Sequence, residues 1–390
     1  MEEVQVVIVG GGPAGIAASA CLNRLDICNV VLEGEDCHAP LWRKRTYDRV
    51  KLHLAKEFCG LPYMPFPPHT PTFVPRVAFM RYLDDYVHNL DVKTKCNRFV
   101  ESASIIDENN ARWKVVARNI LSDATEVYIS KFLVVATGEN NEGYIPDVPG
   151  LSNFEGQYMH SSEYLNGRDL YDKNVLVVGC GNSGMEIAYD LTTWGANASI
   201  VVRSPVHIVT KEMIYIGMRM HKFFSVKIVD KMVVLMSKIR FGNLSRYGIR
   251  RPREVPFSLK SSTGRSPTID VGCVDVIKKG IITVFPGIRD IRNKVVEFDD
   301  GRRRQIDVII FATGYKSNVL NWLKDYESLF KENGMPKRRY PDHWRAENGL
   351  YCAGFGSRGL QGISDDAKQI ANDINFSFNH QQMHCAVPVN

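Results

Sequence analysis

Two stretches of one pattern decide the fold: Val6-Val7-Ile8-Val9-Gly10-Gly11-Gly12-Pro13-Ala14-Gly15 and Val175-Leu176-Val177-Val178-Gly179-Cys180-Gly181-Asn182-Ser183-Gly184. Each is an apolar run followed by G-x-G-x-x-G and by residues that can open a helix. The first glycine allows a tight turn, the second lets the backbone approach a pyrophosphate, and the third lets the helix pack on the strand. One such pattern is weak evidence, but two in register predict two Rossmann-like dinucleotide-binding sites.

The residue that ends the next strand distinguishes the two sites. After the first site, the strand from Asn29 ends in Glu33, whose carboxylate can accept from ribose hydroxyls and would repel a 2′-phosphate. After the second site, Arg203 and Ser204 stand at the equivalent end. A guanidinium there can form charge-assisted hydrogen bonds to a 2′-phosphate. These residues predict FAD at the first site and NADPH at the second.

Two later segments also match each other, because a strand runs into Ala136-Thr137-Gly138 and another into Ala312-Thr313-Gly314. Their placement predicts nested domains in an α/β fold: two Rossmann-like doubly wound dinucleotide-binding domains, with the NADPH domain inserted in the FAD domain. The predicted boundaries are 1–150 and 308–390 for the FAD-binding domain, 165–307 for the NADPH-binding domain, and 151–164 for a linker.

Composition excludes several other classes. The chain has 390 residues, 44% of them hydrophobic, which is enough for a large core and excludes disorder and coiled coil. Its nine cysteines form no C-x-x-C pair, so neither a disulfide framework nor a zinc site is expected, and no metal is predicted.

The acidic Met-Glu-Glu start predicts an intracellular protein without a signal peptide. A net charge of +6 is too mild to indicate nucleic-acid binding.

The segment between the two sites carries a more specific pattern. Phe154, Gly156, His160 and Tyr164 fit F-x-G-x-x-x-H-x-x-x-Y. With this motif the chain resembles the class B flavin-dependent monooxygenases, whereas the missing C-x-x-C argues against disulfide reductases. As a linker, the segment would place His160 to orient the second domain over the flavin; the alternative is a structural histidine.

Three further stretches narrow the resemblance to the plant YUCCA-type monooxygenases, which are indole-3-pyruvate monooxygenases: residues 41–54, 263–272 and 359–368. The resemblance implies NADPH- and O2-dependent oxidative decarboxylation of indole-3-pyruvate to indole-3-acetate, a step of auxin biosynthesis, through a C4a-peroxyflavin. Two alternatives stay open: a monooxygenase that oxygenates sulfur or nitrogen in another small molecule, and a redox sensor that binds FAD and NADPH without turnover.

The predicted site residues follow from the patterns and the resemblance together. His53 is the predicted catalytic residue, able to hydrogen-bond the oxygenated flavin or the substrate keto oxygen; the alternative is a structural histidine beside the flavin. Arg45 and Arg49 are candidates for the substrate carboxylate. The predicted cofactor-binding residues are Gly10, Gly11, Gly12, Pro13, Ala14, Gly15, Glu33, Trp42, Ala136, Thr137, Gly138, Gly179, Cys180, Gly181, Asn182, Ser183, Gly184, Arg203, Ser204, Ala312, Thr313 and Gly314.

The stretch from Met213 to Met236 allows several interpretations. It alternates apolar residues with lysines at roughly helical spacing, which fits a cavity wall, a dimer face or a membrane-surface helix. No integral membrane segment is expected, because the uncharged run near the start is broken by glycines. We expect a cytoplasmic protein, with peripheral association to the endoplasmic reticulum surface as an option. The oligomeric state is left open.

Overall fold

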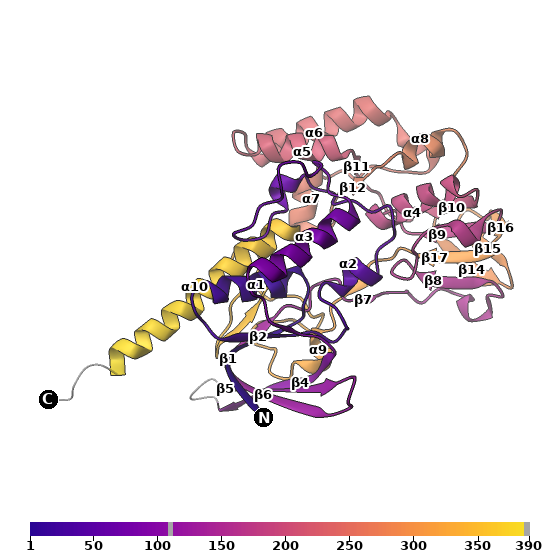
Figure 1. Cartoon of the computed structure of the whole chain (residues 1–390). Coiled ribbons are helices and arrows are strands. Elements are labelled where there is room, and N and C mark those ends of the chain that lie inside the picture. The colour runs from indigo at the N-terminus through magenta and orange to yellow at the C-terminus, as the bar shows by residue number, and fades with distance from the viewer. Residues whose placement is uncertain (108–111, 386–390) are drawn as a thin grey trace. The chain divides into compact units, whose positions relative to one another are not determined.

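The computed structural model describes residues 1–107 and 112–385 and divides into two compact units (Figure 1). Unit 1 consists of Met1–Lys44, Lys56–Glu142 and Tyr315–Asn390. Unit 2 consists of Arg45–Ala55 and Gly143–Gly314. The short strands β7 (Glu142–Gly143) and β18 (Tyr315–Lys316) lie where the chain leaves unit 1 and returns to it.

Unit 1 is built on a seven-stranded sheet in the order β3-β2-β1-β6-β5-β4, with β19 also paired to β6. Strands β3, β2, β1, β6 and β19 are parallel, and β5 and β4 add an antiparallel flank. The strands are β1 (Glu2–Val9), β2 (Asn29–Leu32), β3 (Thr94–Lys95), β4 (Arg98–Asp107), β5 (Arg112–Asn119), β6 (Thr125–Val135) and β19 (Leu350–Cys352). The apolar run at β1 is a fully buried parallel strand, as its sequence predicts.

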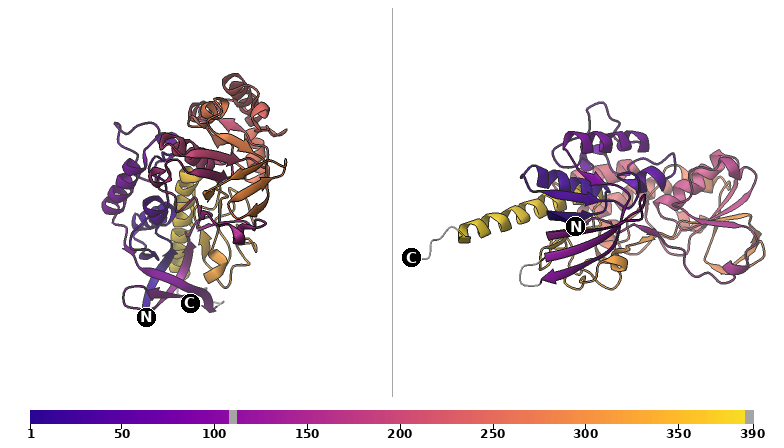
Figure 2. Two further views of the ribbon diagram at one scale, coloured as in Figure 1. Left: turned by 90° about the vertical axis from the view of Figure 1, so that its right-hand side faces the viewer. Right: turned by 60° about the horizontal axis from the view of Figure 1, so that its bottom comes forward.

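The helices of unit 1 include the one that follows the first glycine pattern. That helix, α1, begins at Pro13, whose missing amide hydrogen costs nothing at a first helical position. It packs against α10, the long yellow helix of Figure 2. The helical segments are α1 (Pro13–Asn23), α2 (Pro40–Lys44), η1 (Lys56–Phe58), α3 (Arg76–Asn89), α9 (Val319–Trp322) and α10 (Gly359–Cys385).

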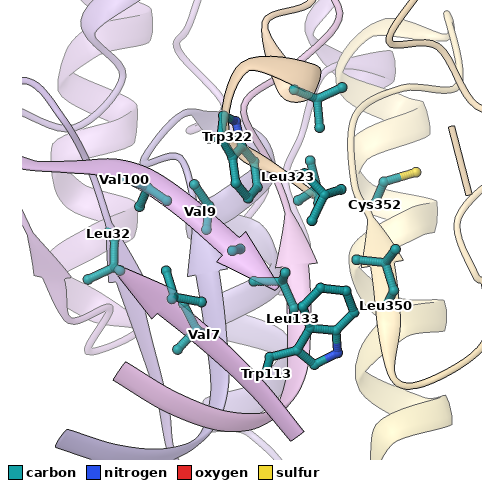
Figure 3. Close-up of a cluster of buried hydrophobic side chains, with 14 of the residues drawn as sticks. Val7, Val9, Leu32, Val100, Trp113, Leu133, Trp322, Leu323, Leu350 and Cys352 are labelled. Atoms are coloured by element: carbon teal, nitrogen blue, oxygen red, sulfur yellow. The ribbon is translucent and has the colours of Figure 1, made fainter. Parts of the chain in front are cut away.

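One hydrophobic core cluster of unit 1 lies on one face of this sheet (Figure 3). Alternate residues of β1, Val7 and Val9, contribute to it together with Leu133 of β6. Trp113 is fully buried there and its indole nitrogen donates to the carbonyl of Asn348 at 2.8 Å, so the ring is buried without an unpaired donor.

Unit 2 is built on a five-stranded parallel sheet in the order β13-β10-β9-β17-β8. A three-stranded antiparallel sheet of β14, β15 and β16 and the pair β11 and β12 complete its strands. The strands are β8 (Gln157–His160), β9 (Asn174–Val178), β10 (Asn197–Val201), β11 (Ile208–Val209), β12 (Thr268–Ile269), β13 (Thr283–Phe285), β14 (Ile288–Arg292), β15 (Val295–Phe298), β16 (Arg303–Gln305) and β17 (Val308–Phe311). The helical segments are η2 (Leu151–Asn153), η3 (Arg168–Leu170), α4 (Asn182–Thr193), α5 (Lys211–Met220), α6 (Val226–Phe241), η4 (Leu244–Tyr247), α7 (Pro256–Thr263) and α8 (Cys273–Lys278).

The boundaries of the units differ from the predicted ones at four places. Residues 151–164, expected as a linker, contain β8, which pairs with β17 in the sheet of unit 2. Strand β17 itself, placed by the prediction in the resumed first domain, pairs with β9 of unit 2. Residues 143–150, predicted in the FAD-binding domain, and residues 45–55 also group with unit 2. In the first two cases the physical reason is the hydrogen-bond ladder, which makes β8, β17 and β9 one sheet.

Two further properties concern binding and location. None of the helices in the described part of the chain combines the length and the apolar character needed to cross a bilayer. Within residues 1–107 and 112–385, no group of three or more His, Cys, Asp and Glu side chains is arranged to hold a metal ion.

Candidate functional site

The first glycine pattern forms a closed turn with one open position. Gly10 has φ +109°, and a Cβ on it would lie 2.6 Å from the carbonyl oxygen of Ala136. A Cβ on Gly15 would lie 1.9 Å from the carbonyl oxygen of Gly10, so helix α1 and the turn are in direct backbone contact. Gly12, in contrast, has nothing within 4 Å of a Cβ position. It is the N-cap of α1 without a side-chain cap, which leaves an uncapped helix N-terminus facing a space that a phosphate can fill.

Glu33 lies directly after β2 and is buried at 8% exposure. Its carboxylate accepts from the backbone amides of Gly11 at 2.7 Å and Glu35 at 2.9 Å. Burial raises the pKa of this carboxyl, while the two amide bonds act in the opposite direction. Glu33 therefore fixes the glycine turn and keeps lone pairs for ribose hydroxyls.

The Ala136-Thr137-Gly138 turn has an unsatisfied polar atom beside this pattern. The hydroxyl of Thr137 is buried and, among the described residues, has no hydrogen-bond partner. Because a buried hydroxyl rarely stays unpaired, it indicates a bound polar group. Trp42 in α2 lies edge-on to Phe79, with ring centroids 4.7 Å apart, and is half-buried. The open Gly12, the carboxylate of Glu33 and this hydroxyl fit the adenosine and pyrophosphate of FAD.

The second glycine pattern repeats the construction of the first in unit 2. Gly179 has φ +115°, and a Cβ on it would lie 2.4 Å from the carbonyl oxygen of Ala312. A Cβ on Gly184 would collide with the carbonyl of Gly179, just as a Cβ on Gly15 would collide with that of Gly10 in unit 1. A Cβ on Gly181, like one on Gly12, would have nothing within 4 Å. Here the threonine of the turn, Thr313, donates its hydroxyl to the carbonyl of Tyr144. The Ala-Thr-Gly turns thus close both patterns, but only the first leaves its hydroxyl unpaired among the described residues.

The other residues predicted at the second site lie around α4 and β10. Arg203 is exposed and Ser204 half-buried just after β10, where the 2′-phosphate of NADPH is expected. Burial raises the pKa of the Cys180 thiol to about 12, which makes this cysteine an inert part of the turn. Ser183 lies in the first turn of α4, whose N-cap, Gly181, has no side-chain cap. The uncapped helix start and the open Gly181 fit a pyrophosphate.

His53 lies against the first two turns of α4. Its Nε2 lies 3.0 Å from Oε1 of Glu186, and its Nδ1 lies 3.1 Å from Nδ2 of Asn182. Because the oxygen of the Asn182 amide accepts from the backbone of Ile269, its nitrogen donates to Nδ1, and Nε2 then carries the proton given to Glu186. Both ring nitrogens are therefore occupied by protein groups next to the second glycine pattern.

Sequence reasoning missed two buried carboxylates on α4 that hold residues 45–55. Glu186, at 2% exposure, accepts from His53, and Asp190, at 7%, lies 3.5 Å from the guanidinium of Arg49. Arg49 also stacks 4.5 Å over the ring of Tyr189, so this candidate for the substrate carboxylate has protein partners. Asn182, Glu186 and Asp190 recur every four residues, a helical spacing that would have placed them on one face.

The monooxygenase motif acts inside unit 2. Phe154 is buried in its core, and a Cβ on Gly156 would lie 2.4 Å from the Phe154 ring. Nε2 of His160 donates to the carbonyl of Gly314 at 3.0 Å, and Nδ1 accepts from the amide of Ser162. Burial lowers the pKa of His160, which favours this neutral form. His160 thus connects β8 with the Ala-Thr-Gly turn.

The last residue of the motif, Tyr164, is buried at 2% exposure. Its hydroxyl donates to Asp190 at 2.7 Å, and burial followed by this hydrogen bond raises its pKa. Phe154, His160 and Tyr164 therefore attach one segment to the core, the turn and helix α4 of unit 2.

Two glycine patterns, one with a buried acid and one with an exposed arginine, define a flavoprotein that is reduced by a nicotinamide nucleotide. The sequence profile of the family described as "Flavin-binding monooxygenase-like" matches residues 3–333, and the chain belongs to that family. The predicted flavin monooxygenase activity is thereby confirmed, with FAD and NADPH as the cofactors.

Individual relatives narrow the relationship. The chain is 54% identical over 373 residues to the probable indole-3-pyruvate monooxygenase YUCCA10 of Arabidopsis thaliana, covering 95% of this chain and 97% of the relative. It is 44% identical to the indole-3-pyruvate monooxygenase YUCCA1 of Oryza sativa subsp. japonica, with 94% and 90% covered. The resemblance to YUCCA-type monooxygenases is thus confirmed.

Among solved structures, a flavin-containing monooxygenase from Stenotrophomonas maltophilia matches with a TM-score of 0.74 at 20% identity, covering 97% of this chain and all of that chain. At this identity the match concerns the fold alone, and it confirms the predicted fold class.

Proposed function

We propose that the chain catalyses the NADPH- and O2-dependent oxidative decarboxylation of indole-3-pyruvate to indole-3-acetate and carbon dioxide. The observation that carries the proposal is the 54% identity, over nearly the full length, to a relative named for this substrate. The two glycine patterns would bind FAD and NADPH, the two nucleotides that this reaction uses. When bound, FAD would supply the redox chemistry that the reaction with NADPH and oxygen requires.

Unit 1 would hold FAD through the residues that fit it. The uncapped start of α1 and the open Gly12 would bind the pyrophosphate, and Glu33 would accept from the ribose. The unpaired hydroxyl of Thr137 would donate to the same ligand. We assign these contacts to FAD because Glu33, acidic and buried, would repel the 2′-phosphate of NADPH.

Unit 2 would hold NADPH in the equivalent way. Gly181 and the start of α4 would bind the pyrophosphate, and Arg203 with Ser204 would bind the 2′-phosphate. We infer that His53 is a positioning residue for this site, since it holds Asn182 of the glycine pattern and Glu186 one turn later. The predicted catalytic contact of His53 with reacting atoms would require its ring to leave both partners.

The location of the protein is a prediction of the same kind. We expect a cytoplasmic enzyme, with peripheral association to the endoplasmic reticulum surface as an option.

The deciding experiment follows NADPH loss and indole-3-acetate formation together, in air, with the purified FAD-containing protein. We expect the two amounts to be nearly equal with indole-3-pyruvate present, and slow NADPH loss without it. NADPH consumption that yields hydrogen peroxide but no indole-3-acetate would reject this substrate in favour of sulfur or nitrogen oxygenation. No flavin bleaching by NADPH under argon would instead favour a redox sensor.

A further inference from the structure

Helix α6 presents an apolar row to solvent. Ile228, Leu235 and Ile239 are 49%, 58% and 77% exposed, and their spacing of seven and four residues places them along one line of the helix. Half-buried Met232 lies on the same line. The residues just before the helix continue it, because Phe223 is 82% and Phe224 is 47% exposed. We call these six side chains the α6 outer face.

The opposite side of α6 already has its partners. Val229, Val233 and Phe241 are buried, and α6 packs against α5 and α7 (Figure 1). Asp230 is fully buried and accepts from the amide of Phe257, at the start of α7, at 2.8 Å. A helix that only covered a core would carry polar residues on its outward side, so the α6 outer face is unexplained by folding.

Lysines flank the α6 outer face. Lys222, Lys227, Lys231 and Lys238 are all exposed, and none of them makes an ion pair with any described residue. The only carboxylates among residues 211–241 are the buried Asp230 and Glu212, which lies at the start of α5. The surface therefore combines exposed apolar side chains with four lysines that make no ion pair among the described residues, whereas Arg240 at the end of the helix pairs with Asp275 of α8.

We propose that the α6 outer face docks on an anionic lipid bilayer. Phe223, Phe224 and the apolar row would enter the interface between headgroups and acyl chains, and the four lysines would contact acidic headgroups. A second copy of the chain fits less well, because a two-fold contact would bring the same lysines against one another. The proposal names the surface and lipid chemistry and is independent of the substrate assigned above.

Co-sedimentation of the FAD-containing enzyme with vesicles tests the proposal. We expect binding to phosphatidylcholine vesicles that contain phosphatidylserine, much weaker binding to phosphatidylcholine alone, and release as sodium chloride is raised. Equal binding to both kinds of vesicle, or binding to neither, would overturn the proposal.

Matched variants test which surface binds. Ile239→Ser should weaken vesicle binding, whereas Leu121→Ser, at an equally exposed leucine of unit 1 (77%), should not. Lys231→Gln should weaken vesicle binding about fivefold, the ratio expected for one lysine at an anionic surface. Lys279→Gln, at another exposed lysine of unit 2, should leave it unchanged.

Two measurements keep these results interpretable. The flavin absorbance and the NADPH oxidation rate of each variant, measured without vesicles, should equal those of the parent, since the α6 outer face contains no residue assigned to a nucleotide. Sedimentation velocity without vesicles should show no dimer that Ile239→Ser dissociates. Finding such a dimer, or equal loss of vesicle binding in Leu121→Ser and Ile239→Ser, would refute bilayer docking.

Discussion

His53 joins parts of unit 2 that lie far apart in the chain, since its partners Asn182 and Glu186 are 129 and 133 residues away. Glu186 is almost fully buried, and a buried carboxylate is costly without a hydrogen-bond donor. His53 provides that donor. The same imidazole also accepts a hydrogen bond from Asn182, which directly follows the open Gly181 of the second glycine pattern. His53, predicted as the catalytic residue, therefore has the contacts expected of a positioning residue for the proposed NADPH site.

Substitution of Glu186 tests this role. We expect Glu186→Ala to lower the free energy of unfolding by about 1–3 kcal/mol, because the Nε2 proton of His53 loses its acceptor, and to weaken NADP⁺ binding. Glu186→Gln keeps an acceptor oxygen and should restore most of both. Urea unfolding and calorimetric titration with NADP⁺ measure the two effects. Glu212→Ala, at an exposed glutamate of α5, is the control, and an equal effect there would contradict the assignment.

Arg203 is the residue expected to select NADPH over NADH. Arg203→Ala should raise the KM for NADPH about ten- to a hundredfold, the value of a charge-assisted hydrogen bond to a phosphate, and leave the KM for NADH unchanged. Steady-state oxidation of both nucleotides measures this. Arg292→Ala removes an exposed arginine elsewhere in unit 2 and should change neither KM. A parallel rise for NADH in Arg203→Ala would show that the guanidinium does not read the 2′-phosphate.

At the scale of elements, the strand-turn-helix start of each unit depends on its third glycine. A methyl group on Gly15 would lie 1.9 Å from the carbonyl oxygen of Gly10, and backbone must move to admit it. We expect Gly15→Ala to cost about 1–3 kcal/mol of stability or to prevent folding. Gly60→Ala, where the nearest atom to a Cβ is 3.8 Å away, should be almost neutral. Thermal unfolding of both variants compares them; equal melting temperatures would argue against a closed turn.

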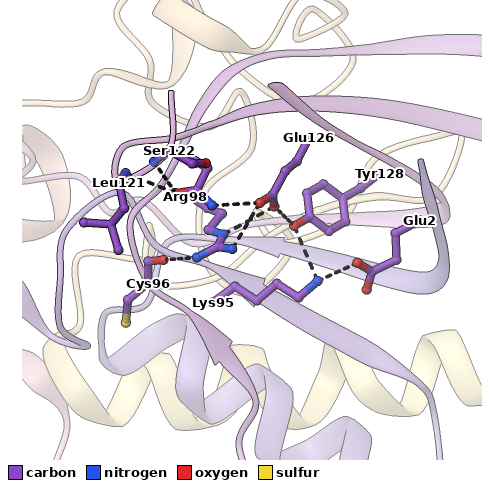
Figure 4. Close-up of polar contacts among 9 residues, drawn as sticks. Glu2, Lys95, Cys96, Arg98, Leu121, Ser122, Glu126 and Tyr128 are labelled. Atoms are coloured by element: carbon purple, nitrogen blue, oxygen red, sulfur yellow. Dashed lines mark hydrogen bonds and ion pairs between the residues drawn. The ribbon is translucent and has the colours of Figure 1, made fainter. Parts of the chain in front are cut away.

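The antiparallel flank of unit 1 contains a polar cluster around Glu126 (Figure 4). Its carboxylate accepts from the hydroxyl of Tyr128 and from the guanidinium of Arg98 at 3.0 Å. The Tyr128 hydrogen bond, and after it the Arg98 contact, hold the pKa of Glu126 at about 2, below its ordinary value of 4.5.

This lowered pKa predicts how stability depends on pH. Because the folded protein holds the Glu126 proton less tightly than the unfolded chain, its contribution is complete above about pH 4.5 and is lost as pH falls toward 2. Glu126→Gln should therefore cost about 1 kcal/mol near pH 7, with a deficit that shrinks below pH 4.5. Urea unfolding from pH 3 to 7 measures this, and Glu332→Gln, at an exposed glutamate of unit 1, should show no deficit at any pH.

For the whole molecule, each unit has its own open glycine, so the two nucleotides should be separable by mutation. Gly12→Ala should fold, since nothing lies near its Cβ, but should lose FAD while still binding NADP⁺. Gly181→Ala should keep its yellow colour and fail to be reduced by NADPH. Flavin absorbance and NADP⁺ titration of the two variants measure this. Loss of both nucleotides in either variant would mean that the sites are not independent.

Much of this organisation could be predicted from sequence because it is local. The glycine patterns, the residues that end the second strands and the Ala-Thr-Gly turns each occupy a few consecutive residues, and the structure shows both strand-turn-helix starts. The placement of residues 45–55 and of β8 could not be predicted, because both depend on partners more than a hundred residues away. A four-residue strand has no sequence signal strong enough to reveal which sheet it joins.

The monooxygenase motif has a meaning for evolution that follows from its place in unit 2. Phe154, His160 and Tyr164 contribute to the integrity of that unit, through its core, Gly314 and Asp190. A descendant that abandoned oxygen chemistry but still needed the unit would remain under selection to keep all three. The contacts of the motif are therefore those of the structure of unit 2, and the motif alone does not specify which reaction a protein that carries it performs.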